Sequence, residues 1–188
     1  MTRTSPPAAA LIRSIAGTVL ALLLAACASE PEPNPLGPEP PAEAEAEAVW
    51  GYIQASGYQR YWQPESLASP GLHRARPPHG PIIRVYVNQI AHKARPLGDG
   101  KLPPGSVLVL ESYTSEPHLY EIDVMAKIPG HRADTGDWAF FRFDPSGSVR
   151  ISDDQARLQA KTENRGCIHC HRRTADETDW LYQPRLAD

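Results

Sequence analysis

The stretch Tyr-Glu-Ile-Asp-Val-Met-Ala-Lys-Ile, residues 120–128, decides the fold class of this chain. Apolar residues at alternate positions are separated by Glu121, Asp123, Met125 and Lys127. Successive side chains of a β-strand point to opposite faces, so a period of two predicts a strand with one face in a hydrophobic core. We therefore expect a half-buried strand over 120–128.

Three further segments have the composition of strands. Ile82–Val87 is dense in β-branched and aromatic residues, 107–110 is apolar on both faces and suits a central strand, and Trp138–Phe143 holds all three phenylalanines of the chain. Turn-forming residues separate these segments, with no regular helical crossovers. Short helices are expected at 88–94 and 153–161. We predict a mainly β (α+β) fold, a curved antiparallel sheet with a few short helices.

A C-x-x-C-H pentapeptide, residues 167–171, lies close to the end of the chain. Cys167 and Cys170 are spaced to add across the two vinyl groups of a porphyrin, and His171 can bind the iron as proximal ligand. A redox disulfide would require a thioredoxin-like βαβ context, and a zinc site would require a second pair of ligands. The sequence around residue 167 offers neither, so we predict one covalently bound haem c.

The first 27 residues have the features of a bacterial export signal. Two arginines precede an apolar run at 15–26, which has the length of a signal-peptide core and is short for a membrane span. The run ends in Leu-Ala-Ala-Cys at 24–27, which resembles a lipobox, so Cys27 is the predicted lipidation site. The alternative is an ordinary secretory signal in which Cys27 is a plain thiol. Ala28, by resemblance to lipoprotein sorting, favours the periplasmic face of the outer membrane of a Gram-negative bacterium.

Three segments are expected along the chain: a signal at 1–27, a tether at 28–48 and a haem domain at 49–188. The tether holds six prolines, six glutamates and almost nothing apolar larger than alanine, so it cannot bury enough surface to fold. The formal net charge of the chain is −3; without the two arginines of the signal and the six glutamates of the tether, the domain is left near +1. This charge gives no indication of a nucleic-acid surface.

Several short blocks resemble the cytochrome P-460 / cytochrome c′-beta family, in the family's order over residues 82 to 182. They are Arg-Val-Tyr-Val-Asn at 84–88, Gly-Ser-Val-Leu-Val-Leu-Glu at 105–111, Val-Met-Ala-Lys at 124–127, Gly-Asp-Trp-Ala-Phe at 136–140, and the C-x-x-C-H motif followed by Asp-Trp at 179–180. The resemblance implies a β-rich, homodimeric, exported haem c protein. It implies that Cys167 and Cys170 form the thioethers, that His171 is the proximal ligand, and that the opposite face of the iron is open to small ligands.

The family divides by chemistry, and Leu110 bears on the division. Members named for their unusual absorption band have a lysine bonded to the porphyrin and oxidise hydroxylamine, whereas c′-beta members lack the bond and bind nitric oxide and carbon monoxide in an apolar pocket. In the cross-linked members the lysine directly precedes the glutamate that here is Glu111. Leu110 occupies that position and cannot form the bond, so the resemblance favours the c′-beta side, with Leu110 in the distal pocket. We interpret Lys127, in a separate strand motif, as a solvated lysine.

An electron carrier needs six-coordinate iron, so a second axial ligand must be sought. Met125 is the only methionine left after removal of the signal, and packing is its expected role. His169 lies inside the pentapeptide, on the wrong side. The other candidates are histidines in or beside loops, where solvation is the expected state: His79, His92, His118 and His131. No residue stands out as a sixth ligand.

Two functions from different classes follow. In the first, which we favour, the haem binds nitric oxide or another small diatomic ligand, or passes single electrons to an unidentified redox partner at the membrane surface. In the second, a haem oxidoreductase oxidises hydroxylamine or nitric oxide, which requires a proton acceptor near the distal face of the haem. Glu163 is the nearest carboxylate upstream of the motif, although an exposed helix-end glutamate is its expected role. A structural lipoprotein with a vestigial haem is a third possibility.

Overall fold

The computed structural model describes residues 1–2, 37–64, 71–75, 77–94 and 100–182. The chain divides into two units, Met1–Pro33 and Asn34–Asp188, and the fold below is that of the second. Cys27 and nearly all of the predicted signal lie outside the described residues. Within the described ranges, no helix is both long enough and apolar enough to cross a membrane.

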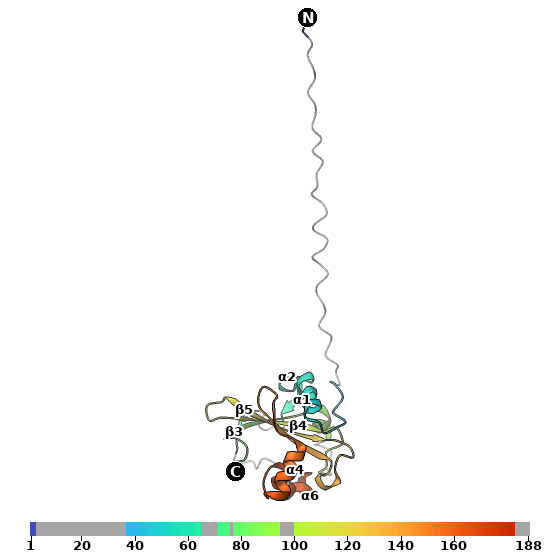
Figure 1. The fold of residues 1–188 in the computed structure, drawn as a ribbon, viewed down its shortest axis with the longest axis vertical. Coiled ribbons are helices and arrows are strands. Elements are labelled where there is room, and N and C mark those ends of the chain that lie inside the picture. The colour runs from blue at the N-terminus through green and yellow to red at the C-terminus, as the bar shows by residue number, and fades with distance from the viewer. Residues whose placement is uncertain (3–36, 65–70, 76, 95–99, 183–188) are drawn as a thin grey trace. The chain divides into compact units, whose positions relative to one another are not determined.

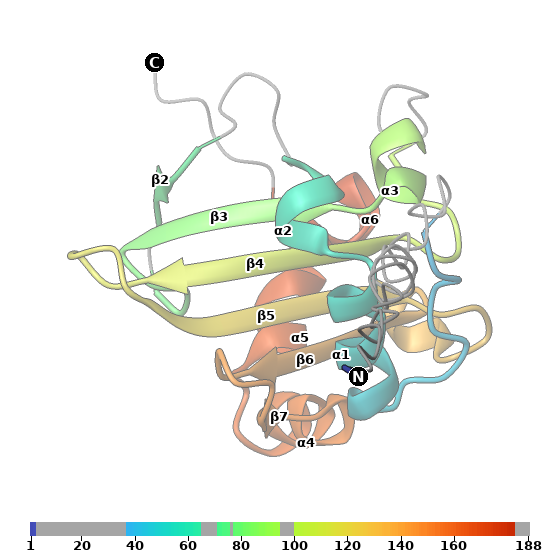
Figure 2. The same ribbon diagram turned by 90° about the horizontal axis from the view of Figure 1, so that it is seen from above.

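An antiparallel sheet of seven strands forms the centre of the domain, in the order β1-β3-β4-β5-β6-β7 with β2 also paired to β3 (Figure 2). The sheet is open, so the prediction of an antiparallel sheet with short helices is confirmed, and β4 is a central strand as expected. The strands are β1 (Gln63–Pro64), β2 (His73–Arg74), β3 (Ile82–Val87), β4 (Val107–Tyr113), β5 (Leu119–Lys127), β6 (Trp138–Phe143) and β7 (Val149–Ile151).

Helices cover both faces of the sheet, as Figure 1 shows with α1 and α2 on one side and α4 and α6 on the other. The α-helices are α1 (Ala46–Ala55), α2 (Tyr58–Tyr61), α3 (Gln89–Ala94), α4 (Asp153–Thr162), α5 (Cys167–His171) and α6 (Ala175–Thr178). Short 3-10 turns lie at Ala133–Thr135 and Arg172–Thr174. Helix α1 begins inside the segment predicted as a tether, and Ala44 and Ala46 pack against the core.

Each face of the sheet therefore has its own hydrophobic core. Val109, Ile122 and Phe141 lie in the first core with residues of α1 and α2, whereas Leu108 and Phe140 lie in the second core with residues of α3, α4 and α5. The alternation along β5 was expected to leave one face in solvent, and that expectation is wrong. The face of β5 that carries its polar residues is covered by the C-terminal helices, which lie far away in the sequence.

The first core contains a buried carboxylate, Glu111, which has no exposed surface. Its Oε1 accepts hydrogen bonds from the Tyr58 hydroxyl at 2.9 Å and from Gln59 Nε2 at 2.5 Å, and its Oε2 accepts one from the Tyr113 hydroxyl at 2.6 Å. A buried carboxylate is tolerated when donors replace the water that it loses. These bonds join α2 to β4 on the side of the sheet opposite α5.

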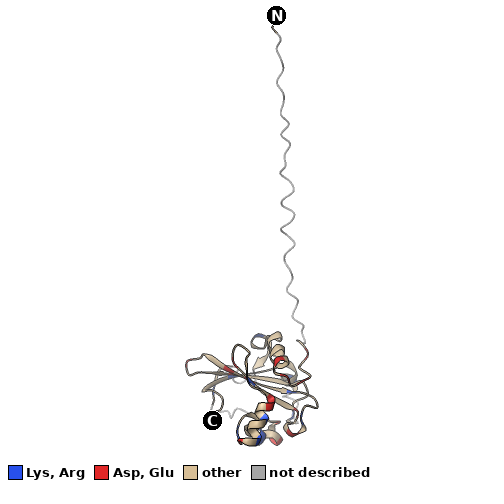
Figure 3. Cartoon of the chain, viewed as in Figure 1, with Lys and Arg blue, Asp and Glu red and all other residues tan. Residues whose placement is uncertain are grey.

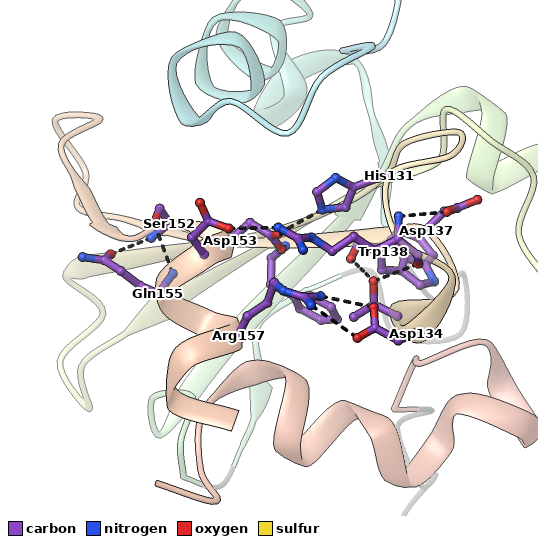
Figure 4. A network of polar contacts seen from close by, with 12 residues as sticks. His131, Asp134, Asp137, Trp138, Ser152, Asp153, Gln155 and Arg157 are labelled. Atoms are coloured by element: carbon purple, nitrogen blue, oxygen red, sulfur yellow. Dashed lines mark hydrogen bonds and ion pairs between the residues drawn. The ribbon is translucent and has the colours of Figure 1, made fainter. Parts of the chain in front are cut away.

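Helix α4, which precedes the C-x-x-C-H segment, is fixed to β6 by the network in Figure 4. Ser152 caps the helix in a capping box with Gln155. The buried Asp153 accepts a hydrogen bond from the Phe140 backbone N–H at 3.0 Å and lies 2.9 Å from Nε2 of His131. The start of the helix is thereby joined to the strand that carries Phe140.

Candidate haem site

The C-x-x-C-H segment folds as the short helix α5, directly after α4. The chain turns between the two helices through Asn164 and Gly166, whose φ angles are 50° and 89°. Residues three apart on a helix share a side, so Cys167 and Cys170 are neighbours on its surface. Both are free and half-buried. Burial raises the pKa of the Cys167 thiol to about 12, and the Asp123 carboxylate adds to the rise.

His171, at the end of α5, is held by the backbone of the following turn. Its Nδ1 lies 2.6 Å from the carbonyl oxygen of Trp180, so Nδ1 donates a proton and Nε2 is left as the nitrogen with a free lone pair. Burial lowers the pKa of the imidazole, which favours the neutral form that binds metals. Rings of Phe140 and Tyr182 lie edge-on to it, with centroids at 5.6 Å and 5.3 Å.

These donors fit a haem better than an isolated metal ion. Two thiols on one side of a helix and an imidazole with a free Nε2 are the groups that haem c attachment requires. Within the described ranges, no group of three or more His, Cys, Asp or Glu is placed to hold a metal ion. The donor set matches the haem interpretation.

A charged cluster lies on the same face of the sheet, and the sequence analysis did not predict it. Asp123 lies 2.7 Å from Nε and 3.2 Å from Nη2 of Arg142, and 2.9 Å from Nδ1 of His79. Burial of the carboxylate opposes its ionisation, but the bonds from His79 and Arg142 outweigh that effect and lower the pKa of Asp123. Glu121 also lies 3.1 Å from Arg142, and burial together with the Asp123 charge raises the pKa of Glu121.

Leu110 lies beside this cluster. The register pairs Leu110 with Val85 on β3 and with Asp123 on β5, and paired residues project from the same face. Leu108, two positions along the strand, belongs to the second core, which also contains Phe140 and Ile168 of α5. The resemblance implies an apolar distal pocket around Leu110. In the structure, the carboxylate of Asp123 lies directly across from Leu110 on the neighbouring strand.

The structure brings His79 close to His171, with ring centroids 6.3 Å apart, and gives the other candidates different contacts. Met125 packs in the second core, His131 bonds to Asp153, and Glu163 is exposed at the end of α4, where it pairs with Arg165. The remaining histidines have other settings: half-buried on α3 (His92), exposed beside Glu116 (His118), and beside Arg173 (His169).

Comparison with known protein families supports the same cofactor. The family model described as Cytochrome P460 matches residues 62–183, which include the sheet, the charged cluster and all of α5. The chain belongs to the cytochrome P460 family. A search of curated proteins found no match. Membership of the family makes this a haem protein with a redox or ligand-binding role.

The burial of Lys127, a residue of the cytochrome P460 motifs, differs from what the sequence predicted. Lys127 was expected to be solvated, but its side chain is 11% exposed and its Nζ lies 2.6 Å from Oδ2 of Asp179. The ammonium group also lies 5.3 Å from the centroid of the Trp138 ring. The expectation is wrong because the segment after α6 folds back over β5, a contact between residues 52 positions apart.

Proposed function

We propose that this protein is an exported c-type haem protein that binds nitric oxide or another small diatomic ligand at its iron, or passes single electrons. The observation that carries the proposal is the bond from His171 Nδ1 to the Trp180 carbonyl, which leaves Nε2 available to the metal. Cys167 and Cys170 hold the porphyrin through thioethers. When bound, the haem would supply a redox-active iron able to bind a small external ligand.

Leu110 supports ligand binding over hydroxylamine oxidation. Its aliphatic side chain provides no amine to bond to a porphyrin, and it lies on the same face as the second core. Nitric oxide and carbon monoxide bind ferrous iron without a hydrogen bond from the protein. The proposed protein therefore captures such ligands directly and has little or no hydroxylamine turnover.

The charged cluster favours the second candidate, a haem oxidoreductase of hydroxylamine or nitric oxide. Such a reaction requires a proton acceptor close to the iron. Asp123 is ionised at neutral pH, because its pKa is lowered, and it lies across from Leu110. It bonds to His79, whose ring lies 6.3 Å from that of His171 in α5. Asp123 is thus a better candidate for the proton acceptor than Glu163.

The cellular location of the protein is also part of the proposal. We infer that Cys27 carries the lipid, that the following proline- and glutamate-rich segment is a tether, and that the domain works as a homodimer on the periplasmic side of the outer membrane. Support comes from the lipobox-like residues 24–27 and from the tether composition.

The spectrum of the purified ferrous protein tests the function. We expect high-spin five-coordinate iron, and nitric oxide binding with a rate proportional to its concentration, because no side chain must leave first. A six-coordinate low-spin ferrous spectrum would contradict direct ligand binding and would leave single-electron transfer as the role. His79→Ala and Met125→Leu would then identify the ligand, since the residue responsible is the one whose loss gives high-spin iron.

A matched variant separates the two candidate functions. Leu110→Lys introduces the amine that the cross-linked members have, beside Asp123. If the porphyrin lies against Leu110, this variant should gain the unusual absorption band for which those members are named, and the unmodified protein should lack it. The band in the unmodified protein, together with sustained hydroxylamine oxidation, would favour the oxidoreductase.

A further inference from the structure

Two blocks of the family motifs, 124–127 and 179–180, are joined beside His171 by the contact between Lys127 and Asp179, and only the Trp180 carbonyl among them has a part in the proposed function. The carbonyl that accepts the bond from His171 belongs to Trp180, nine residues further along the chain. Asp179 and Trp180 both have left-handed backbone conformations, with φ of 52° and 72°. Side chains with a Cβ adopt this conformation at a cost in free energy, so contacts with the rest of the fold must hold it.

Local backbone bonds from the Trp180 and Leu181 N–H groups to the carbonyls of Thr174 and Thr178 close this turn, and Asp179 anchors it to the rest of the fold. Its Oδ2 accepts a hydrogen bond from Lys127 Nζ at 2.6 Å and another from the Leu102 backbone N–H at 2.8 Å. The carboxylate is 5% exposed and the lysine side chain 11%, so water screens the pair little. Trp180 packs against Phe140, with ring centroids 6.1 Å apart. The ion pair thus ties the turn to β5, in the rigid centre of the sheet.

We propose that Lys127 is a positioning residue for the iron ligand, acting through Asp179 and the carbonyl of Trp180. The inference rests on the proposed role of His171. The bond to Nδ1 increases the electron density that an imidazole gives to a metal, and hydrogen bonds of this kind tune reduction potential. By fixing the turn, Lys127 keeps the carbonyl in line with Nδ1. Iron held by His171 then has a stronger ligand bond and a lower potential.

A structural role alone is the rival explanation, because breaking a buried ion pair destabilises a protein wherever the pair lies. The two explanations differ in what they change. Loss of a purely structural pair lowers the melting temperature but does not change the iron–histidine stretching frequency or the reduction potential. A positioning pair changes the iron–histidine bond in the folded protein.

The experiment uses the haem-loaded full chain with Lys127→Met, which keeps most of the side-chain volume and removes the charge. Lys127→Arg keeps the charge, and Lys161→Met removes an exposed lysine of α4 as a matched control. The measurements are the iron–histidine stretching frequency of the ferrous protein by resonance Raman, and the reduction potential. We expect Lys127→Met to lower the frequency and raise the potential, Lys127→Arg to restore most of both, and Lys161→Met to change neither.

A lower melting temperature with an unchanged stretching frequency and potential in Lys127→Met would overturn the proposal. If that variant does not fold, Asp179→Asn replaces it, since the amide oxygen can still accept from Leu102 while the charge is lost. If neither variant folds and Lys127→Arg does, the pair is a requirement of folding, and the positioning role is wrong. Absence of an iron–histidine stretch in the unmodified protein would instead refute the proposed ligand, His171.

Discussion

Replacing Tyr113 with phenylalanine should destabilise the domain more than the same change at Tyr58. Tyr113 donates a hydrogen bond of 2.6 Å to Oε2 of the buried Glu111, whereas the 2.9 Å bond from Tyr58 reaches Oε1, to which Gln59 also donates. Hydrogen bonds to charged groups contribute about 1.5–3 kcal/mol. We expect Tyr113→Phe to lower the free energy of unfolding by an amount in that range. Tyr58→Phe should cost about 0.5–1.5 kcal/mol, because Gln59 still donates to the same oxygen.

The pH dependence of stability should change with the same substitution. Burial raises the pKa of Tyr113 above its ordinary value of 10.0, and the hydrogen bond to Glu111 raises it further. Above pH 10 the unfolded chain releases the phenolic proton while the folded chain retains it, so the free energy of unfolding falls as pH rises. The contribution is fully present below pH 10. Tyr113→Phe removes this titration, and its stability should fall less steeply between about pH 10 and 12.

The assay is urea denaturation of the haem-loaded protein, followed by far-ultraviolet circular dichroism at neutral pH and at several alkaline values. Tyr61→Phe is the control, because Tyr61 is 52% exposed and surface changes of this kind usually alter stability by less than about 0.5 kcal/mol. The reasoning would be refuted if Tyr113→Phe lost no more stability than Tyr61→Phe. An equal loss at Tyr58 and Tyr113 would refute the distinction between the two carboxylate oxygens.

Two further predictions concern covalent attachment of the haem and of the lipid. Cys167→Ala combined with Cys170→Ala should abolish the haem stain on a denaturing gel, because no thiol remains in the motif; a stain that persists would contradict thioether attachment. Cys27→Ser should move the protein from the membrane fraction to the soluble or secreted fraction, because the acyl chains supply the membrane affinity; full retention in the membrane would exclude Cys27 as the anchor.

Local patterns in the sequence were enough to predict the four longest strands and two of the helices, and they singled out the candidate haem ligands. The period of two over 120–128 depends only on side chains that alternate across a pleated backbone, and β5 forms there. The helix predicted at 153–161 begins with a capping box and matches α4. The C-x-x-C-H spacing is likewise local, since the three donors lie within five residues.

Tertiary structure alone decided what covers the second face of the sheet. Glu121, Asp123 and Lys127 have the pattern of a solvated strand face, because a period of two cannot show whether a distant helix lies on the polar side. The C-terminal segment covers this face and pairs Lys127 with Asp179, 52 residues away, while Asp123 meets His79 from a loop 44 residues earlier. Such pairings depend on strand order, register and the path of the chain, which residue spacing along a sequence does not specify. The carbonyl that orients His171 is a backbone atom, so no side-chain pattern could have revealed it.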